Sequence, residues 1–359
     1  MDRAAEGEIV LLKVNPVDPE KEIIRQAAEA IRRGGLVAFP TETVYGLGAD
    51  ALYPEAVDRI FAAKERPSFD PLIVHIACFE DLRLIARELP PQTYLLSRHF
   101  WPGPLTLILP RAEMLSARVT AGLDTVAVRI PDHPVALALI RAAETPIAAP
   151  SANLFGHVSP TTARHVLDDL GDRVDLILDG GPTRIGIEST VLDLSGETPV
   201  ILRPGGTDRE TLNSVLGEIA LNVNRGQRGG ERFEFASPGL MERHYSPRAE
   251  LILFRGAEMK ALTAMKARLH ECLSTGKRVG LLVASEDRAV CESYSVIIED
   301  LGSRENLRQI AARLFAAMRA LDERGVEVIL ARGFGTTGLG LAIEDRLAKA
   351  AGGRVIEIH

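Results

Sequence analysis

The fold is organised around residues 64–75, which read KERPSFDPLIVH. Residues 54–63, just before this stretch, carry apolar side chains at helical spacing. That helix must end before Pro67, because a residue that precedes proline is disfavoured in the α region. Residues 72–76 then predict a short, buried strand that contains His75. A helix, an irregular loop and a strand therefore follow one another directly.

Two cations, Lys64 and Arg66, stand at the end of the predicted helix. Arginine offers a planar fork of donors for phosphate or carboxylate, and lysine offers a mobile point charge. Together with the histidine in the next strand, this pair favours a site for an anionic ligand. A solvated helix end with a histidine in the core is the other interpretation of the same residues.

Length, charge and cysteine content bound the class of protein. A chain of 359 residues is longer than one ordinary core, so two domains are expected. A formal charge of −7 disfavours a surface that coats nucleic acid broadly, although a local basic patch is compatible with it. No signal peptide and no apolar run of membrane-spanning length are visible. The three widely spaced cysteines indicate a reducing compartment, and we expect a cytoplasmic protein.

Short apolar strands alternate with amphipathic helices along residues 9–203, which predicts an α/β fold. The strand predicted at residues 36–40 runs directly into residues 41–50, TETVYGLGAD. This segment concentrates hydroxyls, carboxylates and glycines at a strand end, where ligands bind in open α/β sheets. It matches neither the P-loop nor the GxGxxG pattern, and a structural turn is the alternative interpretation.

Other predicted strands are also followed or preceded by hydroxyl, amide or cationic side chains: Ser151, Asn153, Ser189 and Arg203. Arg129 lies inside an apolar strand at residues 125–130, where an unpaired charge would be costly. Its partner should be either a ligand carboxylate or a protein acid. This recurrence favours one convergent site for a small anionic ligand. Since no covalent catalytic constellation is visible, the site should bind and polarise its ligand.

Six segments of the chain, in the same order, resemble the YrdC-like family, the threonylcarbamoyl-AMP synthases that begin threonylcarbamoyladenosine modification of tRNA. The matching segments are residues 40–51 (PTETVYGLGADA), 64–67 (KERP), 71–76 (PLIVHI), 101–106 (WPGPLT), 151–153 (SAN) and 189–191 (STV). The resemblance covers residues 20–207 and implies a twisted open sheet with helices. One departure is Asp70, which stands where members often have Asn and adds negative charge near the expected phosphate site.

The resemblance also implies the reaction and its residues. The expected products are L-threonylcarbamoyladenylate and pyrophosphate, made from L-threonine, bicarbonate or CO2, and ATP. Mg²⁺ is expected to arrive with ATP, without dedicated protein ligands. L-threonine-binding residues would be Thr43, His75, Arg129, Ala149 and Ser189. ATP-binding residues would be Lys64, Arg66, Asp70, Thr125, Ser151, Asn153, Ser159, Arg203, His244 and Tyr245, with Lys64 and Arg66 as the catalytic pair. The expected partner is the downstream complex that transfers the threonylcarbamoyl group to tRNA, with tRNA itself at most a weak contact.

The alternation of strands and helices restarts at residue 251, which predicts a small parallel α/β domain. By resemblance to the family's two-domain form, residues 1–207 and residues 248–359 are the two domains, the second Rossmann-like. The glycine-rich residues 333–340, GFGTTGLG, are expected to be structural or regulatory and not catalytic.

Residues 208–247 are expected to link the two domains. By the same resemblance, His244 and Tyr245 should help to close the catalytic cleft as a lid. Lids exclude water from reactive intermediates. A plain tether with a solvated histidine and tyrosine is the alternative interpretation.

Two other functions compete with this hypothesis. A module that binds tRNA or double-stranded RNA would place Lys64 and Arg66 on phosphates. The acidic balance speaks against it, and it predicts steeply salt-dependent binding of RNA without ATP turnover. A carbamoyl-transfer enzyme of the hydrogenase-maturation kind shares this domain type. Such chains carry an acylphosphatase-like segment and cysteine-pair zinc motifs, which are not visible in this sequence.

Overall fold

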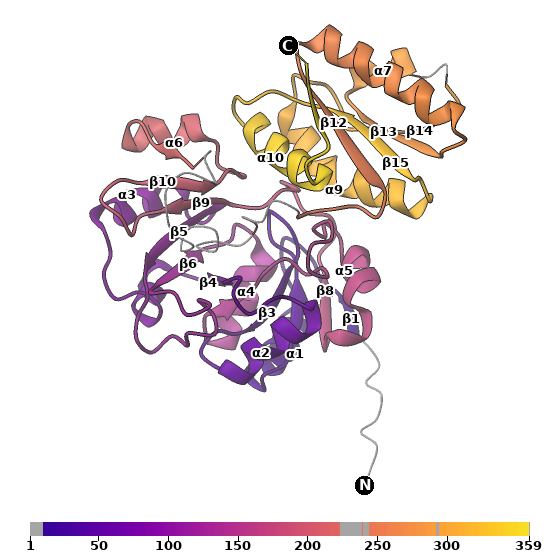
Figure 1. Cartoon of the computed structure of the whole chain (residues 1–359). Coiled ribbons are helices and arrows are strands. Elements are labelled where there is room, and N and C mark those ends of the chain that lie inside the picture. Colours follow the sequence, from indigo (N-terminus) through magenta and orange to yellow (C-terminus); the bar gives the residue numbers. More distant parts are fainter. Residues whose placement is uncertain (1–9, 223–238, 240–243, 292–293, 359) are drawn as a thin grey trace.

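The computed structural model describes residues 10–222, 239, 244–291 and 294–358. It contains a large α/β domain at the N-terminal side and a smaller α/β domain above it (Figure 1). The predicted fold class, a large open sheet followed by a small parallel-sheet domain, is confirmed.

In its described part, the N-terminal domain is built on a mixed sheet with the order β1-β8-β2-β3-β7-β4-β6-β5-β9-β10-β11. The strands are β1 (Val10–Lys13), β2 (Val37–Phe39), β3 (Gly46–Asp50), β4 (Ile73–His75), β5 (Leu105–Pro110), β6 (Thr125–Arg129), β7 (Ile147–Ala148), β8 (Leu176–Asp179), β9 (Thr190–Asp193), β10 (Val200–Arg203) and β11 (Ala220–Leu221). The helices are α1 (Lys21–Arg32), α2 (Pro54–Lys64), α3 (Pro91–Phe100), α4 (Pro134–Ala143), α5 (Ala163–Leu170) and α6 (Arg209–Leu216), with short 3-10 helices at Phe79–Leu84 and Gly171–Arg173.

Helices cover both faces of this sheet, so its central strands are buried on both sides. In β2, Val37 and Phe39 belong to the apolar cluster that contains α1 and α4. The residue between them, Ala38, belongs to the cluster on the opposite face, which contains α2 and α5. Successive residues of a strand point to opposite faces, which explains why β2 reads as a continuous apolar run.

The polar segment TETVYGLGAD does not end in a loop. Its second half forms β3, which pairs antiparallel with β2. A Cβ atom at Gly48 would lie 2.7 Å from the Phe39 ring and 2.8 Å from Ile147, so only glycine fits there. Glycine is a weak strand former, and for this reason the sequence pattern did not predict β3.

The expected linker begins with regular structure. Residues 209–216 form α6, and β11 pairs parallel with β10 at the edge of the large sheet.

Helix α4 leads to a prediction about pH. His133 is its N-cap, and its Nδ1 accepts a hydrogen bond from the Val135 N–H at 3.2 Å. Burial, together with nearby Arg184, lowers the pKa of His133 to about 4. In the unfolded chain His133 takes up a proton near pH 6.5, whereas in the folded chain it stays neutral down to about pH 4. His133 therefore lowers the unfolding free energy as the pH falls from about 6.5 towards 4.

Replacing His133 with asparagine should make the unfolding free energy less dependent on pH in this window. Asparagine keeps the capping acceptor but does not titrate. One full proton corresponds to about 1.4 kcal/mol per pH unit, which sets the upper limit of the change in slope. Urea unfolding of both proteins at several pH values between 4 and 7 measures it, and identical slopes would contradict the prediction.

The C-terminal domain has a fully parallel sheet with the order β14-β13-β15-β12-β16. Its strands are β12 (Glu250–Gly256), β13 (Val279–Val283), β14 (Ile297–Asp300), β15 (Val328–Arg332) and β16 (Val355–Ile358), and its helices are α7 (Glu258–Ser274), α8 (Ser285–Cys291), α9 (Leu307–Glu323) and α10 (Gly340–Ala351). Because β15 lies between β12 and β13, the strand order differs from the 3-2-1-4-5-6 order of dinucleotide-binding domains.

The two domains are packed against each other through α9 and α10, which face the large sheet (Figure 1). A Cβ atom at Gly186 would lie 2.5 Å from the Cα atom of Ala312, so glycine lets the loop before β9 touch α9 directly. Among the described residues, two largely buried ion pairs cross the interface, Arg319 with Asp169 and Arg346 with Glu188, each at 2.7 Å. The C-terminal domain is therefore close to the loops that precede β9.

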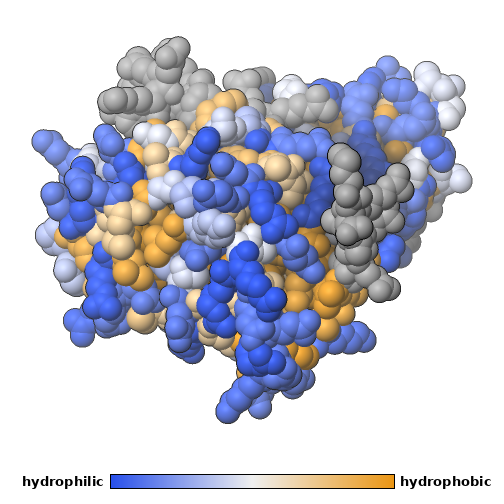
Figure 2. Space-filling view, turned by 90° about the horizontal axis from the view of Figure 1, so that it is seen from below, coloured by the Kyte–Doolittle hydropathy of each residue, from blue (hydrophilic) through white to orange (hydrophobic). Residues whose placement is uncertain are grey.

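The surface seen from below is covered mostly by polar side chains, with apolar residues in separate patches between them (Figure 2). None of the described helices has both the length and the apolarity that a bilayer crossing requires. Cys78 and Cys272 are not joined to any other described cysteine.

Candidate active site

A small cavity of about 50 Å³ lies where loops and strands of the N-terminal domain meet the segment that precedes β12. Many of the predicted site residues line it: Thr43, Arg66, His75, Arg129, Ala149, Ser151, Ser189, Arg203, His244 and Tyr245. The structure thus brings these residues together from distant parts of the chain. Their roles towards ligands stay predictions.

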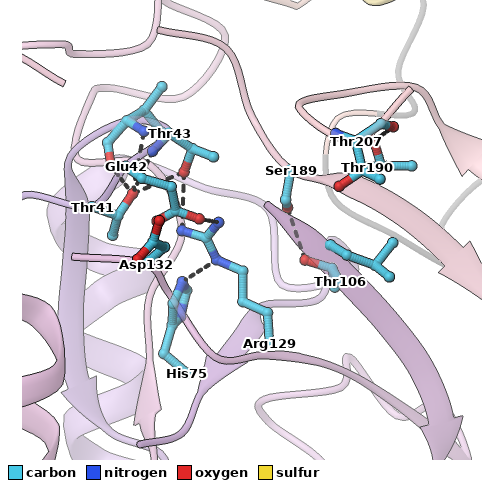
Figure 3. Close-up of polar contacts among 12 residues, drawn as sticks. Thr41, Glu42, Thr43, His75, Thr106, Arg129, Asp132, Ser189, Thr190 and Thr207 are labelled. Carbon is cyan, nitrogen blue, oxygen red and sulfur yellow. Dashed lines mark hydrogen bonds and ion pairs between the residues drawn. The ribbon is translucent and has the colours of Figure 1, made fainter. Parts of the chain in front are cut away.

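Arg129 is the centre of a buried polar network on one side of this cavity (Figure 3). Its guanidinium donates to Glu42 Oε1 at 3.0 Å, to Thr43 Oγ1 at 2.9 Å and to His75 Nε2 at 2.9 Å. Parallel pairing of β4 with β6 sets His75 opposite Arg129. The partner that its strand position demanded is therefore present, and it is the protein acid Glu42. Burial raises the pKa of Glu42, and Arg129 acts against that rise.

His75 is held in one neutral form by this network. Its Nε2 accepts the hydrogen bond from Arg129 Nε, so the ring proton lies on Nδ1. Burial and the charge of Arg129 lower the pKa of His75 well below its usual value. His75 is consequently an uncharged member of the cavity wall at neutral pH.

Lys64 does not line the cavity but lies directly behind Ser151, which does. Helix α2 ends at Lys64, because Glu65 takes a left-handed conformation with a φ of 53°. The Lys64 ammonium donates to the backbone carbonyl oxygens of Ser151, at 2.6 Å, and Asn153. Burial and the neighbouring Arg66 lower the pKa of Lys64 well below its usual value. Lys64 therefore fastens the loop after β7 to the end of α2.

Arg66 turns back onto its own loop. It donates to the carbonyl oxygens of Asp70, at 3.0 Å, and Pro71, at 2.8 Å, and its guanidinium lies 2.9 Å from the Asp70 carboxylate. Its guanidinium carbon also lies 5.8 Å from the centre of the Phe155 ring. Asp70 does not line the cavity, and burial raises the pKa of its carboxyl. The negative charge that seemed unfavourable near a phosphate site is thus paired with Arg66.

Ser189 and Arg203 form a third part of the wall. Ser189 Oγ lies 2.8 Å from Thr106 Oγ1 (Figure 3), and Arg203 Nη2 donates to the Ser189 carbonyl oxygen at 3.0 Å. The chain after Arg203 then presses against the start of β9. A Cβ atom at Gly205 would lie 2.3 Å from the Ser189 carbonyl carbon and 2.4 Å from the Glu188 carbonyl oxygen.

Replacing Gly205 with alanine should therefore push Arg203 and Ser189 apart. Forcing an extra carbon into a packed site typically costs about 1–3 kcal/mol, and we expect a loss of stability in this range together with lower activity. Gly196→Ala is the matched control, because a Cβ atom there meets nothing within 4 Å. Thermal unfolding and steady-state activity measure both variants, and equal behaviour of the two would contradict the prediction.

The remaining predicted residues lie outside the cavity lining. Asn153 donates through its side-chain amide to the Leu154 carbonyl oxygen at 2.7 Å, and Ser159 donates to Glu188 Oε1 at 2.5 Å. Thr125 is the first residue of β6 and Arg129 the last, which separates them by about 13 Å at the usual rise of a strand. A ligand that reaches Thr125 must extend well beyond this cavity.

Two acids of the site, Glu42 and Glu188, are not among the predicted site residues. Glu42 stands within the quoted TETVYG motif, and the need of Arg129 for a partner could have singled it out. Glu188 directly precedes Ser189 and lines the cavity. Burial alone would raise the pKa of Glu188, but the positive charges of Arg346 and Arg203 hold it below the usual value. No signal near residue 188 revealed its partner, which comes from the other domain.

His244 and Tyr245 close the cavity on the side of the C-terminal domain. Both are buried, and their ring centres lie 4.1 Å apart. Burial and several nearby cations lower the pKa of His244 well below its usual value, while burial raises the pKa of Tyr245 to about 12. A solvated histidine and tyrosine on a plain tether are therefore not what the structure contains.

Sequence comparison finds two family models on this chain. The model described as "Telomere recombination", for Sua5, YciO and YrdC proteins, matches residues 29–205. The model described as "Threonylcarbamoyl-AMP synthase, C-terminal domain" matches residues 207–352.

Similar proteins cover nearly the whole chain. Threonylcarbamoyl-AMP synthase of Pyrococcus abyssi is 48% identical over 335 residues, 93% of this chain and 96% of that protein. The protein of the same name from Bacillus subtilis is 48% identical over 341 residues, 94% of this chain and 95% of that protein. The crystal structure of P. abyssi Sua5 complexed with L-threonine superposes with a TM-score of 0.89 at 46% identity, covering 98% of this chain and 99% of that chain. With both family models in order and relatives that match from end to end, the chain belongs to the threonylcarbamoyl-AMP synthase family, in its two-domain form.

Proposed function

We propose that this protein makes L-threonylcarbamoyladenylate and pyrophosphate from L-threonine, bicarbonate or CO2, and ATP, in the cytoplasm. The product would serve the first step of threonylcarbamoyladenosine modification of tRNA and pass to a downstream transfer complex. The observation that supports this most is one cavity lined by cations, hydroxyls and a buried Arg129 network, in a chain of this family. Its charges suit phosphates on one side and an amino acid on the other.

The chemistry needs no nucleophile from the protein. The threonine amine adds to CO2, or condenses with bicarbonate with loss of water, to form a carbamate, and a carbamate oxygen attacks the α-phosphorus of ATP while pyrophosphate leaves. The protein positions the reactants and stabilises the developing negative charge. We assign that charge stabilisation to Arg66 and Arg203, which line the cavity, and to Lys64 behind them.

On the other side, Arg129 would hold the threonine carboxylate. Its three described hydrogen bonds use three of the five N–H groups of a guanidinium, which leaves two for a ligand. Thr43, Ser189 and the backbone of Ala149 line the same side of the cavity and would orient the amine and the hydroxyl group.

Mg²⁺ would arrive bound to the phosphates of ATP and neutralise the leaving pyrophosphate. The acids closest to the expected phosphate position already have cationic partners. Asp70 is paired with Arg66, and Glu188 is paired with Arg346. Protein cations, and not protein carboxylates, would therefore face the phosphates.

The cavity, at about 50 Å³, is small for a nucleotide, and we propose that part of its wall moves to admit the substrates. We assign this movement to the segment that carries His244 and Tyr245, which would close over the bound reactants as a lid and exclude water from the labile carbamate.

The experiment that tests the proposal is pyrophosphate release from ATP, with threonine and bicarbonate each omitted in turn. Release that requires both supports the proposal. Pyrophosphate release that does not depend on threonine would favour the carbamoyl-transfer hypothesis. Salt-dependent RNA binding with no release from an intact fold would favour the RNA-binding reading.

A further inference from the structure

Several side chains of the described part of the C-terminal domain reach the wall of the candidate active site, and three of them contact it through Glu188 or Tyr245. They are Phe315 on α9 and Arg346 and Lys349 on α10, and all three are buried. Of these, Arg346 has the most direct connection. Its side chain is fully buried, although it comes from a different domain than every cation that lines the cavity.

Arg346 reaches a wall residue of the cavity through Glu188. Arg346 Nε donates to Glu188 Oε2 at 2.7 Å, and Ser159 Oγ donates to the other carboxylate oxygen, Glu188 Oε1, at 2.5 Å. Both oxygens of Glu188 are thus occupied by donors. A carboxylate held in this way can lie beside a phosphate-binding region without presenting its oxygens to the phosphates.

Arg346 also contacts the residue that closes the cavity. Its guanidinium carbon lies 5.1 Å from the centre of the Tyr245 ring, within the range of a cation–π interaction. The Tyr245 ring is in turn stacked on Phe315, with ring centres 5.5 Å apart and an interplanar angle of 26°. The C-terminal domain therefore provides the surface on which Tyr245 rests.

The charges tie Arg346 to both domains. Arg346 Nη1 donates to the neighbouring Asp345 at 2.6 Å, and Lys349 Nζ donates to the same Asp345 oxygen at 2.6 Å. One acid of α10 thus faces two cations, and Glu188 supplies a second negative charge from across the domain interface. Arg346 in turn balances Glu188, a buried carboxylate in the cavity wall that would be costly to keep charged without nearby cations.

We propose that Arg346 is a positioning residue of the active site, which holds the Glu188 carboxylate away from the ATP phosphates and holds Tyr245 in its closed position. The C-terminal domain thereby supplies part of the active site. This inference rests on the proposed function for its substrate. It predicts that loss of Arg346 weakens ATP use, because Glu188 is released beside the phosphates and Tyr245 loses its support.

The test compares Arg346→Met with Arg354→Met, the same change at an arginine of the same domain that binds the Leu251 carbonyl oxygen and does not line the cavity. Arg346→Met should lower kcat/KM for ATP by about thirtyfold or more, largely through KM, while Arg354→Met stays within threefold. Arg346→Lys should recover most of the loss. A merely structural role would lower the melting temperature without a selective rise in KM for ATP.

Two double variants locate the effect. In a Glu188→Gln background the cost of Arg346→Met should shrink to a few-fold, because no free carboxylate is left to repel ATP. In a Tyr245→Leu background it should also shrink, because the cation–π partner is absent. Unchanged costs in both backgrounds, or equal behaviour of Arg346→Met and Arg354→Met, would overturn the proposal. If the Arg346→Met variant does not fold, the double variant Glu188→Gln with Arg346→Gln is measured in its place, because it leaves neither position with an unpaired charge.

Calorimetric binding of ATP separates this proposal from the proposed function. Weaker ATP binding by Arg346→Met supports the positioning role whether or not turnover is observed. Wild-type protein that binds ATP but releases no pyrophosphate with threonine and bicarbonate would overturn the proposed function alone. ATP affinity that is equal in wild type, Arg346→Met and Arg346→Lys would overturn the role of Arg346.

Discussion

Replacing Lys64 with methionine is expected to reduce kcat/KM for ATP by about 10²–10³-fold, the range typical for removing one group that stabilises charge in the transition state. Two losses combine. One buried positive charge next to the expected phosphates disappears, and the carbonyl oxygens of Ser151 and Asn153 lose their common donor. The loop after β7, which lines the cavity with Ser151, is then no longer fastened to α2.

The stability of the Lys64→Met variant should fall less than its activity. A buried carbonyl left without a donor costs about 1–3 kcal/mol, which a stable two-domain protein can tolerate. Lys21→Met is the matched control, because Lys21 is an exposed lysine at the start of α1. Steady-state pyrophosphate release and thermal unfolding measure both. Activity of Lys64→Met within threefold of wild type, with an unchanged fold, would show that Lys64 only fills space.

Replacing Arg129 with methionine should raise the KM for threonine by about tenfold to a hundredfold, while the KM for ATP changes only a few-fold. Hydrogen bonds to charged groups contribute about 1.5–3 kcal/mol, which sets this range. The same change leaves Glu42 as a buried carboxylate without its cation, and removing one partner of a buried pair typically costs about 3–5 kcal/mol of stability. Both effects must be separated.

The double variant Glu42→Gln with Arg129→Met separates them. Glutamine removes the unpaired charge, so the stability should largely return, whereas the use of threonine should stay impaired because the guanidinium is still missing. Glu42→Gln alone serves as the control for the change at residue 42. Substrate titrations and urea unfolding of the three variants provide the measurement. Equal losses for threonine and ATP in the double variant would rule out the assignment of Arg129 to the threonine side.

The local pattern of the sequence determined most of the secondary structure. Periodicity and prolines act over a few neighbouring positions, so α2, predicted over residues 54–63, is observed at Pro54–Lys64. The position of Arg129 in an apolar strand also revealed, without any structure, that a partner must exist. The quoted motifs identified the family and most residues of the cavity wall.

Only the tertiary structure decided which side chains meet. Glu42 and Arg129 are far apart in sequence, and parallel pairing of β4 with β6 together with the turn after β2 places them at 3.0 Å. The glycine-rich segment can form β3 because Gly48, which has no Cβ atom, fits between Phe39 and Ile147. The sequence pattern did not identify Arg346 as a site residue, because its helix has the pattern of an ordinary amphipathic helix. Its partner Glu188 lies in the other domain, and interdomain packing is set by the whole surface of both domains, which no local pattern encodes.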